Sequence, residues 1–156
     1  MNLQVLRAHD APELDAVRQL FREYAESLGF DLCFQDFDRE LAELPGAYAP
    51  PAGRLLLATV DDQSAGCIAL RALSPTICEM KRLYVRSEFR GKQIGRVLVE
   101  RLIDEARRIG YAQMRLDTVP SMQDAIRLYR SLGFVTIPPY RHNPIPGALY
   151  FELYLQ

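Results

Sequence analysis

Apolar residues recur along this chain at two spacings, and each spacing predicts a different kind of element. A spacing of three to four residues keeps one face of a helix apolar, and it marks several segments of the chain. The predicted helices cover 11–27, a short segment from Phe37 to Leu44 that stops at Pro45, 95–109 and 123–131. Asp10 is suited to start the first of them, with Pro12 in its first turn.

Runs of apolar and β-branched residues between turn signals predict the strands. They cover 3–6, 55–60, 65–73, 77–85, a core at 114–116, 134–137 and 149–155. The polar turn 61–64 separates two of these runs, as expected for a β-hairpin. The order of helices and strands predicts a mixed sheet with helices packed on its faces, since a purely parallel sheet would not contain the central hairpins.

Size and composition narrow the possible functions. The chain has 156 residues, which predicts a single domain over 1–156, and 49% hydrophobic residues, enough for a sizeable core. The net charge of -1 gives no basic surplus, so we expect no nucleic-acid partner. No run approaches the roughly 18 apolar residues of a membrane span, and the first ten residues lack a signal-peptide core. We therefore expect no membrane association and a cytoplasmic location.

The cysteines and histidines give no sign of a metal site. Cys33, Cys67 and Cys78 lie well apart and outside a C-x-x-C pattern, which favours buried or free thiols. His9 and His142 are far apart in the sequence and lack the spacing of metal ligands. We expect no metal.

A short basic turn with two glycines, RGKQIGR at 90–96, lies between a predicted strand and a predicted helix. Glycines let the backbone bend so that successive N–H groups point into one concavity. The first turn of the next helix adds unpaired N–H donors and the positive end of its dipole. Arg90, Lys92 and Arg96 add positive charge, although a solvated basic face is the alternative for these side chains. We interpret the turn as a phosphate site, with a pyrophosphate as the expected ligand.

Two segments resemble the GNAT superfamily of acyl-CoA-dependent N-acetyltransferases. The first is EMKRLYV at 79–85 followed by RGKQIG at 90–95, which resembles the family's fourth strand and its R/Q-x-x-G-x-G/A pyrophosphate loop. The second is AIRLYRSLGF at 125–134, which is similar to the family's A-x-x-L-Y-x-x-x-G-F signature. The resemblance implies an α/β (α+β) fold with a mixed, mainly antiparallel central sheet of six to seven strands and about four flanking helices.

Two positions depart from the family pattern. Gln93 stands where the loop usually has its central glycine. If Gln93 keeps a helix-like backbone it can present its N–H without strain, whereas a positive φ would cost roughly 1 kcal/mol. Met122 stands where many members have an asparagine, so one polar contact is missing unless Ser121 replaces it.

The resemblance also implies acetyl-CoA as the co-substrate and a place for each part of it. The pantetheine arm would pair with the main chain along 83–85, and the N–H groups of 93–96 would hold the pyrophosphate. The predicted cofactor-binding residues are Leu83, Tyr84, Val85, Arg90, Gly91, Lys92, Gln93, Ile94, Gly95, Arg96, Ser121 and Met122.

Acetyl transfer to an amine needs a base for the amine and an acid for the leaving thiolate. Glu79 is the candidate base, because strand alternation places it on the same face as Leu83, upstream where the amine would arrive. An ion pair with Lys81 or Arg115 is the alternative for Glu79. Tyr129 is the candidate acid through its place in the second motif, and packing of helix against sheet is its alternative.

The sequence predicts the acceptor more coarsely. In GNAT-like proteins the region of the first two helices borders the acceptor groove, and here it is acidic, with Arg39 as the one basic residue between 23 and 43. The acidic residues of this stretch are Glu23, Glu26, Asp31, Asp36, Asp38, Glu40 and Glu43. An acidic rim would steer a cationic amine, unless these residues form only a solvated helical face. We expect a small-molecule or peptide amine as the acceptor, with a preference for cationic ones.

Two alternatives accompany this interpretation. The departures at Gln93 and Met122 would also suit a non-catalytic acyl-CoA-binding sensor or interaction module. The C-terminal strand 149–155 could form a homodimer contact, but the same apolar pattern suits an internal strand.

Overall fold

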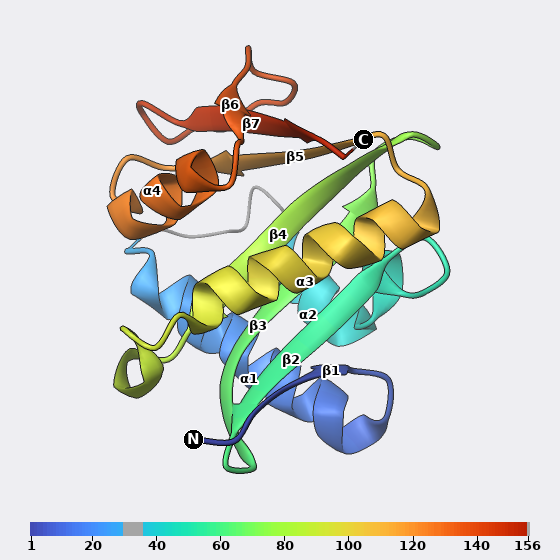
Figure 1. Cartoon of the computed structure of the whole chain (residues 1–156), viewed down its shortest axis with the longest axis vertical. Helices are drawn as coiled ribbons and strands as arrows, with labels where there is room; N and C mark the ends of the chain where they lie inside the picture. Colours follow the sequence, from blue (N-terminus) through green and yellow to red (C-terminus); the bar gives the residue numbers. More distant parts are fainter. Residues whose placement is uncertain (30–35, 156) are drawn as a thin grey trace.

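The computed structural model describes residues 1–29 and 36–155, and it confirms the predicted fold class (Figure 1). The strands are β1 (Leu3–Arg7), β2 (Arg54–Val60), β3 (Gln63–Ala72), β4 (Ile77–Val85), β5 (Gln113–Thr118), β6 (Val135–Thr136) and β7 (Leu149–Tyr154). They form one seven-stranded sheet in the order β1-β2-β3-β4-β5-β7-β6. Neighbouring strands are antiparallel except β4 and β5, which are parallel.

Helices cover both faces of the sheet. They are α1 (Ala11–Ser27), α2 (Phe37–Glu43), α3 (Ile94–Ile109) and α4 (Gln123–Ser131). The Asp10 carboxylate caps α1 by accepting a hydrogen bond from the Glu13 N–H at 3.0 Å. Two single 3₁₀ turns, Gly46–Tyr48 and Ser87–Phe89, lie in the connections before β2 and before α3. The bounds of α1 and α4 agree with those predicted, because caps and glycines mark their ends in the sequence.

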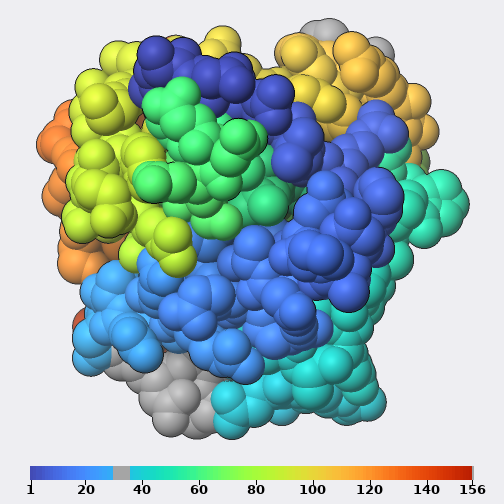
Figure 2. Space-filling model, turned by 90° about the horizontal axis from the view of Figure 1, so that it is seen from below, coloured from blue at the N-terminus to red at the C-terminus, as the bar shows by residue number. Residues whose placement is uncertain are grey.

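The sheet separates two hydrophobic cores. The larger core lies under α3 and α4 and includes Leu98, Leu102 and Phe151, all fully buried. The smaller core lies under α1 and α2 and includes Phe21 and Leu57. Figure 2 shows α1, in blue, covering this second face, with α2 in cyan beside it.

Strands β4 and β5 separate after a short common stretch. They pair only from Ile77 with Gln113 to Glu79 with Arg115. β4 then continues along β3 as far as Val85, while β5 continues along β7. The two strands therefore diverge in the middle of the sheet, and α4 lies beside the opening (Figure 1).

A β-bulge interrupts β4 at Arg82. Cys67 of β3 pairs with Tyr84 and Ala69 pairs with Lys81, so two steps on β3 oppose three on β4. Arg82 has a φ of 63°, which is rare for a residue other than glycine. The extra residue reverses the alternation of side chains along the rest of the strand.

The bulge corrects the prediction that Glu79 and Leu83 share a face. Leu83 and Val85 pack against the larger core, together with Cys78 and Met80. Glu79 neighbours Cys78 along the strand and therefore points to the opposite face, the side of α1 and α2.

The C-terminal strand is internal to the sheet. β7 pairs with β5 on one side and with β6 on the other. The pairing with β5 covers all six residues of β7, whereas the two-residue β6 covers only the part around Phe151 and Glu152. Among residues 1–29 and 36–155, no helix is long and apolar enough to cross a membrane.

Candidate active site

A groove of about 730 Å³ lies along the end of β4, the 90–96 turn and the start of α4. Of the twelve residues predicted to bind the cofactor, eleven line it, and Lys92 does not. The eleven are Leu83, Tyr84, Val85, Arg90, Gly91, Gln93, Ile94, Gly95, Arg96, Ser121 and Met122. The structure thus brings together two segments of the chain that are more than twenty residues apart.

The backbone of the 90–96 turn has the shape that an anion site requires. Gly91 has a φ of 79°, and Gln93 has φ 65° and ψ 16°, which is the left-handed conformation. The N–H of Val97 donates to the carbonyl of Gln93 at 3.0 Å, which is the first hydrogen bond of α3. The N–H groups of residues 94–96 therefore have no carbonyl partner within the helix. Gln93 therefore has a positive φ and not a helix-like backbone, and this conformation carries roughly 1 kcal/mol of strain.

Two basic side chains of the turn are anchored to the walls of the groove. Arg90 Nε donates to the carbonyl of Val85 at 3.0 Å, and Arg96 Nη2 donates to Ser131 Oγ at 2.7 Å. A Cβ atom at Gly95 would project between Val85 and Leu128, at 3.9 and 3.8 Å from their side chains. A side chain at this position would therefore fill part of the groove at ordinary contact distance.

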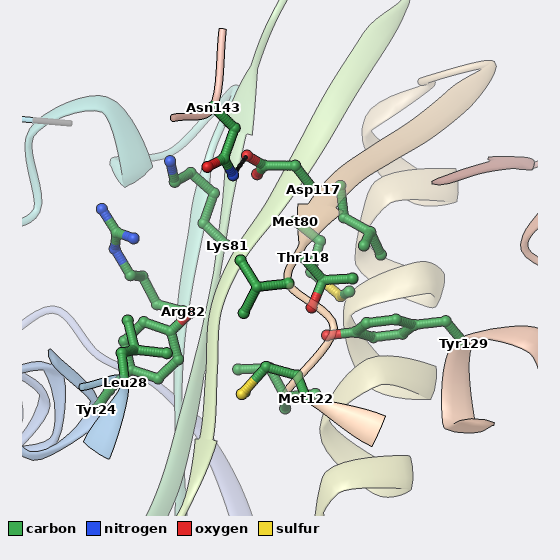
Figure 3. Close-up of a pocket in the computed structure, with 13 residues that line it drawn as sticks. Tyr24, Leu28, Met80, Lys81, Arg82, Asp117, Thr118, Met122, Tyr129 and Asn143 are labelled. Atoms are coloured by element: carbon green, nitrogen blue, oxygen red, sulfur yellow. Dashed lines mark hydrogen bonds between the residues drawn. The ribbon is translucent and has the colours of Figure 1, made fainter. Parts of the chain in front are cut away.

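A smaller cavity of about 50 Å³ lies where β4 and β5 diverge (Figure 3). Its walls come from α1, β4, β5 and α4 and from two loops, one after β5 and one before β7. The lining residues are Tyr24, Leu28, Met80, Lys81, Arg82, Leu83, Leu116, Asp117, Thr118, Val119, Met122, Tyr129 and Asn143. Tyr24, Leu83 and Met122 line both this cavity and the groove, so the two are adjacent.

Tyr129 belongs both to the larger core and to the lining of the small cavity. Its ring packs in the larger core, with centroids 5.7 Å from Phe134 and 6.3 Å from Phe151. Its hydroxyl nevertheless points into the small cavity (Figure 3). Burial raises the pKa of Tyr129 above its usual value, which keeps the hydroxyl protonated at neutral pH, as a proton donor requires.

Glu79 is fully buried and lies outside the lining of the cavity. Arg71 Nε donates to Oε1 at 2.8 Å, the Tyr140 hydroxyl donates to Oε2 at 2.7 Å, and Arg141 forms an ion pair with Oε2. Burial alone would raise the pKa of Glu79, but the positive charges of Lys81, Arg141 and Arg71 outweigh it and hold the pKa below its usual value. The carboxylate is therefore ionised and already accepts donors at both oxygens.

Comparison with known proteins agrees with this geometry. The acetyltransferase (GNAT) family profile matches residues 14–134. The chain belongs to the GNAT family. An uncharacterized N-acetyltransferase of Schizosaccharomyces pombe is 42% identical over 154 residues, covering 97% of this chain and 94% of that protein. The sequence-based prediction of an acetyltransferase enzyme is thereby confirmed.

Solved structures show the same fold. A GNAT-family acetyltransferase from Staphylococcus aureus superposes with a TM-score of 0.83 at 17% identity, covering 99% of this chain and all of that one. A putative acetyltransferase from Salmonella typhimurium, solved with its cofactor acetyl-CoA, has a TM-score of 0.70 at 23% identity and covers 99% and 94% of the two chains.

The sequence analysis did not identify several polar residues that line the small cavity. Asp117, at the end of β5, accepts a hydrogen bond from Asn143 Nδ2 at 3.1 Å. Lys81 is 8% exposed, and burial lowers its pKa to about 7. Asp117 lies one residue beyond the predicted strand core, so a longer strand prediction would have found it. Asn143 comes from a loop whose path the sequence does not predict.

Three carboxylates of the acidic region of this GNAT protein, Glu23, Glu40 and Glu43, form ion pairs with arginines. Glu23 accepts both Nε and Nη2 of Arg86, at 2.9 and 2.8 Å. Glu40 likewise holds Arg82 through two hydrogen bonds of 2.9 Å. These two carboxylates therefore hold α1 and α2 against β4 and its end, and their charge is not free to steer a cation. Asp31 and Cys33 lie outside the described residues, while Cys67 and Cys78 are buried free thiols.

Proposed function

We propose that this GNAT protein transfers an acetyl group from acetyl-CoA to a primary amine of a small molecule or peptide, by direct attack in a ternary complex. The observation that carries the proposal is the adjacency of the groove and the small cavity at the point where β4 and β5 diverge. The groove would hold the cofactor, and the thioester would reach the cavity past Leu83 and Met122. The amine would enter the cavity from the side of α1.

The residues around the groove support the binding of coenzyme A. The N–H groups of the first turn of α3 would hold the pyrophosphate, because they combine free donors with the helix dipole. The bulge at Arg82 leaves one residue of β4 out of the ladder with β3, so a main-chain N–H there could meet the acyl carbonyl or pantetheine, while the Arg82 carbonyl accepts the Cys67 thiol at 3.4 Å. Ser121 lines the groove beside Met122 and can supply a polar contact.

For the chemistry, we propose Tyr129 as the acid that protonates the leaving thiolate, since its protonated hydroxyl points into the cavity. Glu79, the base predicted from the sequence, remains our first candidate for deprotonating the amine. Asp117 is the second candidate, because it lines the cavity while Glu79 does not. The reaction itself needs no metal.

The experiment that tests the function has two parts. Calorimetry should register binding of acetyl-CoA and CoA, and a thiol assay should register CoA release when amines are supplied. Glu79→Gln, Asp117→Asn and Tyr129→Phe should each be compared with the native chain, and loss of a general acid or base should lower kcat by about 10²-fold or more. Unchanged turnover in a variant removes that residue from its role.

Binding without turnover across a broad amine panel would favour the second candidate, a non-catalytic acyl-CoA sensor. We further expect a single cytoplasmic domain over 1–156 that acts without nucleic acid. A homodimer could use the part of the β7 edge that the two-residue β6 leaves uncovered, at Leu153 and Tyr154.

A further inference from the structure

We propose that Asn143 is a positioning residue, which turns the carboxylate of Asp117 toward the acceptor amine so that Asp117 takes the proton the amine must lose. This role rests on the proposed function, and it favours Asp117 over Glu79 as the base. Its basis is a hydrogen bond in the wall of the small cavity, between the end of β5 and a loop that is held on both sides of Asn143.

The side-chain amide of Asn143 is fixed in one orientation. Its Oδ1 accepts the N–H of Ile145, two residues further along the chain, at 3.0 Å. Only the oxygen of the amide can accept this N–H, so the NH₂ group must face the other way. There, Nδ2 donates to Asp117 Oδ2 at 3.1 Å (Figure 3). The turn at Asn143 therefore aims a hydrogen-bond donor at the carboxylate of Asp117.

The loop before β7, which carries Asn143, is held on both sides of this residue. Before Asn143, Arg141 forms an ion pair with the fully buried Glu79. After it, Gly147 lies against the segment that follows β5, so closely that a Cβ atom there would be 2.9 Å from Pro120 Cγ. These contacts keep Asn143 beside the end of β5, where its hydrogen-bond partner lies.

Asp117 has one carboxylate oxygen left for a ligand. Within residues 1–29 and 36–155, Asn143 alone donates to Asp117, and Oδ1 receives no hydrogen bond. Asp117 lines the small cavity and is partly exposed. Glu79, in contrast, accepts donors at both oxygens and lies outside the lining. A carboxylate that is held at one oxygen and open at the other is suited to accept an N–H from an amine.

The proposed acid shares the cavity with Asp117. Burial is the main cause that raises the pKa of Tyr129, and the charges of Tyr24 and Asp117 add to it, so Asp117 acts electrostatically on Tyr129. Asp117 lies at one end of the cavity and Tyr129 nearer the other (Figure 3). An amine that enters between them would have a proton acceptor on one side and a proton donor on the other.

The protons of the reaction then balance. The ammonium gives one proton to Asp117 Oδ1, and the neutral nitrogen bonds to the thioester carbon. The C–S bond breaks, and the thiolate takes the proton of the Tyr129 hydroxyl. The nitrogen loses a second proton as the amide forms, which restores Tyr129, and Asp117 releases its proton to solvent. Asn143 takes no proton in any step and acts only through Asp117.

Asn143→Ser tests the donor while keeping the turn. The serine hydroxyl can still accept an N–H two residues further on, but it is too short to reach Asp117. The assay follows transfer of radiolabelled acetyl from acetyl-CoA to spermidine, glycinamide or a short peptide with a free N-terminus. The kcat for the best of these amines should fall about tenfold, the effect of one hydrogen bond to a charged group. The KM for acetyl-CoA should change less than about twofold, because Asn143 does not line the groove.

The deciding measurement repeats the substitution in the Asp117→Asn variant. Loss of the base should lower kcat by about 10²-fold or more, a rate that the radiolabel still registers. If Asn143 acts through Asp117, adding Asn143→Ser should then change kcat by less than about twofold. His142→Gln, which alters an exposed neighbour in the same loop, is the control and should keep the native kcat.

Three results would overturn this role of Asn143. A tenfold loss from Asn143→Ser in both backgrounds, with native melting temperatures, would show a structural effect on the loop. A native kcat in Asn143→Ser would show that the hydrogen bond does not matter for the reaction. A native kcat in Asp117→Asn, with turnover lost in Glu79→Gln, would leave the acetyltransferase standing with Glu79 as its base. Binding of acetyl-CoA without acetyl transfer to any amine would instead overturn the proposed function, and the role of Asn143 with it.

Discussion

Glu105 offers a quantitative test of which interactions hold α3, one wall of the groove, against the sheet. It lies in α3, the helix whose first turn lines the groove, and its side chain is fully buried. Arg54 of β2 donates to it at 2.7 Å, and Arg7 of β1 lies at 2.8 Å. Arg101 and Arg108 of the same helix add longer contacts of 3.3 and 3.7 Å. The carboxylate thus ties α3 to the far edge of the sheet.

The lowered pKa of Glu105 gives the contribution of this carboxylate to the free energy of unfolding. Burial would raise that pKa, but hydrogen bonds from Arg7, Arg54 and Arg101 lower it from 4.5 to about 2. A depression of this size corresponds to about 3 kcal/mol of folding free energy at pH 7. Because the folded-state pKa is the lower one, this stabilisation is present above pH 4.5 and is lost as the pH falls towards 2. About 1.5 kcal/mol should remain at pH 3.

Urea unfolding of the native chain and of Glu105→Gln, measured from pH 7 to pH 3, checks this expectation. At pH 7 the free energy of unfolding of the variant should be lower by up to about 3 kcal/mol; the loss is smaller if the partly exposed Arg7 regains contact with water. The difference between native chain and variant should shrink by up to about 2 kcal/mol at pH 3. Glu43→Gln, which removes an exposed pair with Arg39, is the control and should cost less than about 0.5 kcal/mol. A gap that stays constant with pH would refute the electrostatic account.

Three other predictions concern the backbone and the acid. Gly66→Ala would place its Cβ 2.6 Å from the carbonyl oxygen of Tyr84, so the free energy of unfolding should fall by about 2 kcal/mol in urea titrations. Gly91→Ala meets no neighbour but takes a φ of 79°, so a loss of about 1 kcal/mol together with weaker CoA binding by calorimetry is expected. Gln93→Gly relieves the strain at φ 65°, so it should raise the free energy of unfolding by up to about 1 kcal/mol and leave CoA binding nearly unchanged. Because burial raises the pKa of Tyr129, the rate of the native enzyme should show no loss from its ionisation below pH 10.

Local signals explain why most of the fold could be predicted. Asp10 and Pro12 mark the start of α1, and Gly110 and Gly133 mark the ends of α3 and α4. The turn at Asp61 and Asp62, both with positive φ, is the kind that joins antiparallel strands. The 90–96 turn of the groove was predicted from neighbouring residues alone, whereas the residues at 83–85 and 121–122 were predicted only from the resemblance to the GNAT family.

The cavity was harder to predict because its residues meet only through the tertiary fold. Glu79 was expected to pair with Lys81 or Arg115 if it was not a base. The charge of Lys81 does lower the pKa of Glu79, but nothing in the sequence indicated the direct contacts from Arg71, Tyr140 and Arg141. Two of these partners come from the loop before β7, whose path follows no periodic pattern. Pairing across sixty residues leaves no trace in the spacing of a single sequence.

The bulge at Arg82 shows how one residue can change the interpretation of a whole strand. Nothing in the motif marks Arg82 for a positive φ, a conformation that arginine seldom adopts. The bulge sends Glu79 and Lys81 to the acceptor face and returns Leu83 and Val85 to the larger core. A regular strand would have placed Glu79 and Leu83 together and left no extra main-chain groups beside the cavity. The ion pair of Arg82 with Glu40 binds the bulge to α2, so the geometry of the groove and of the small cavity depends on a contact between segments about forty residues apart.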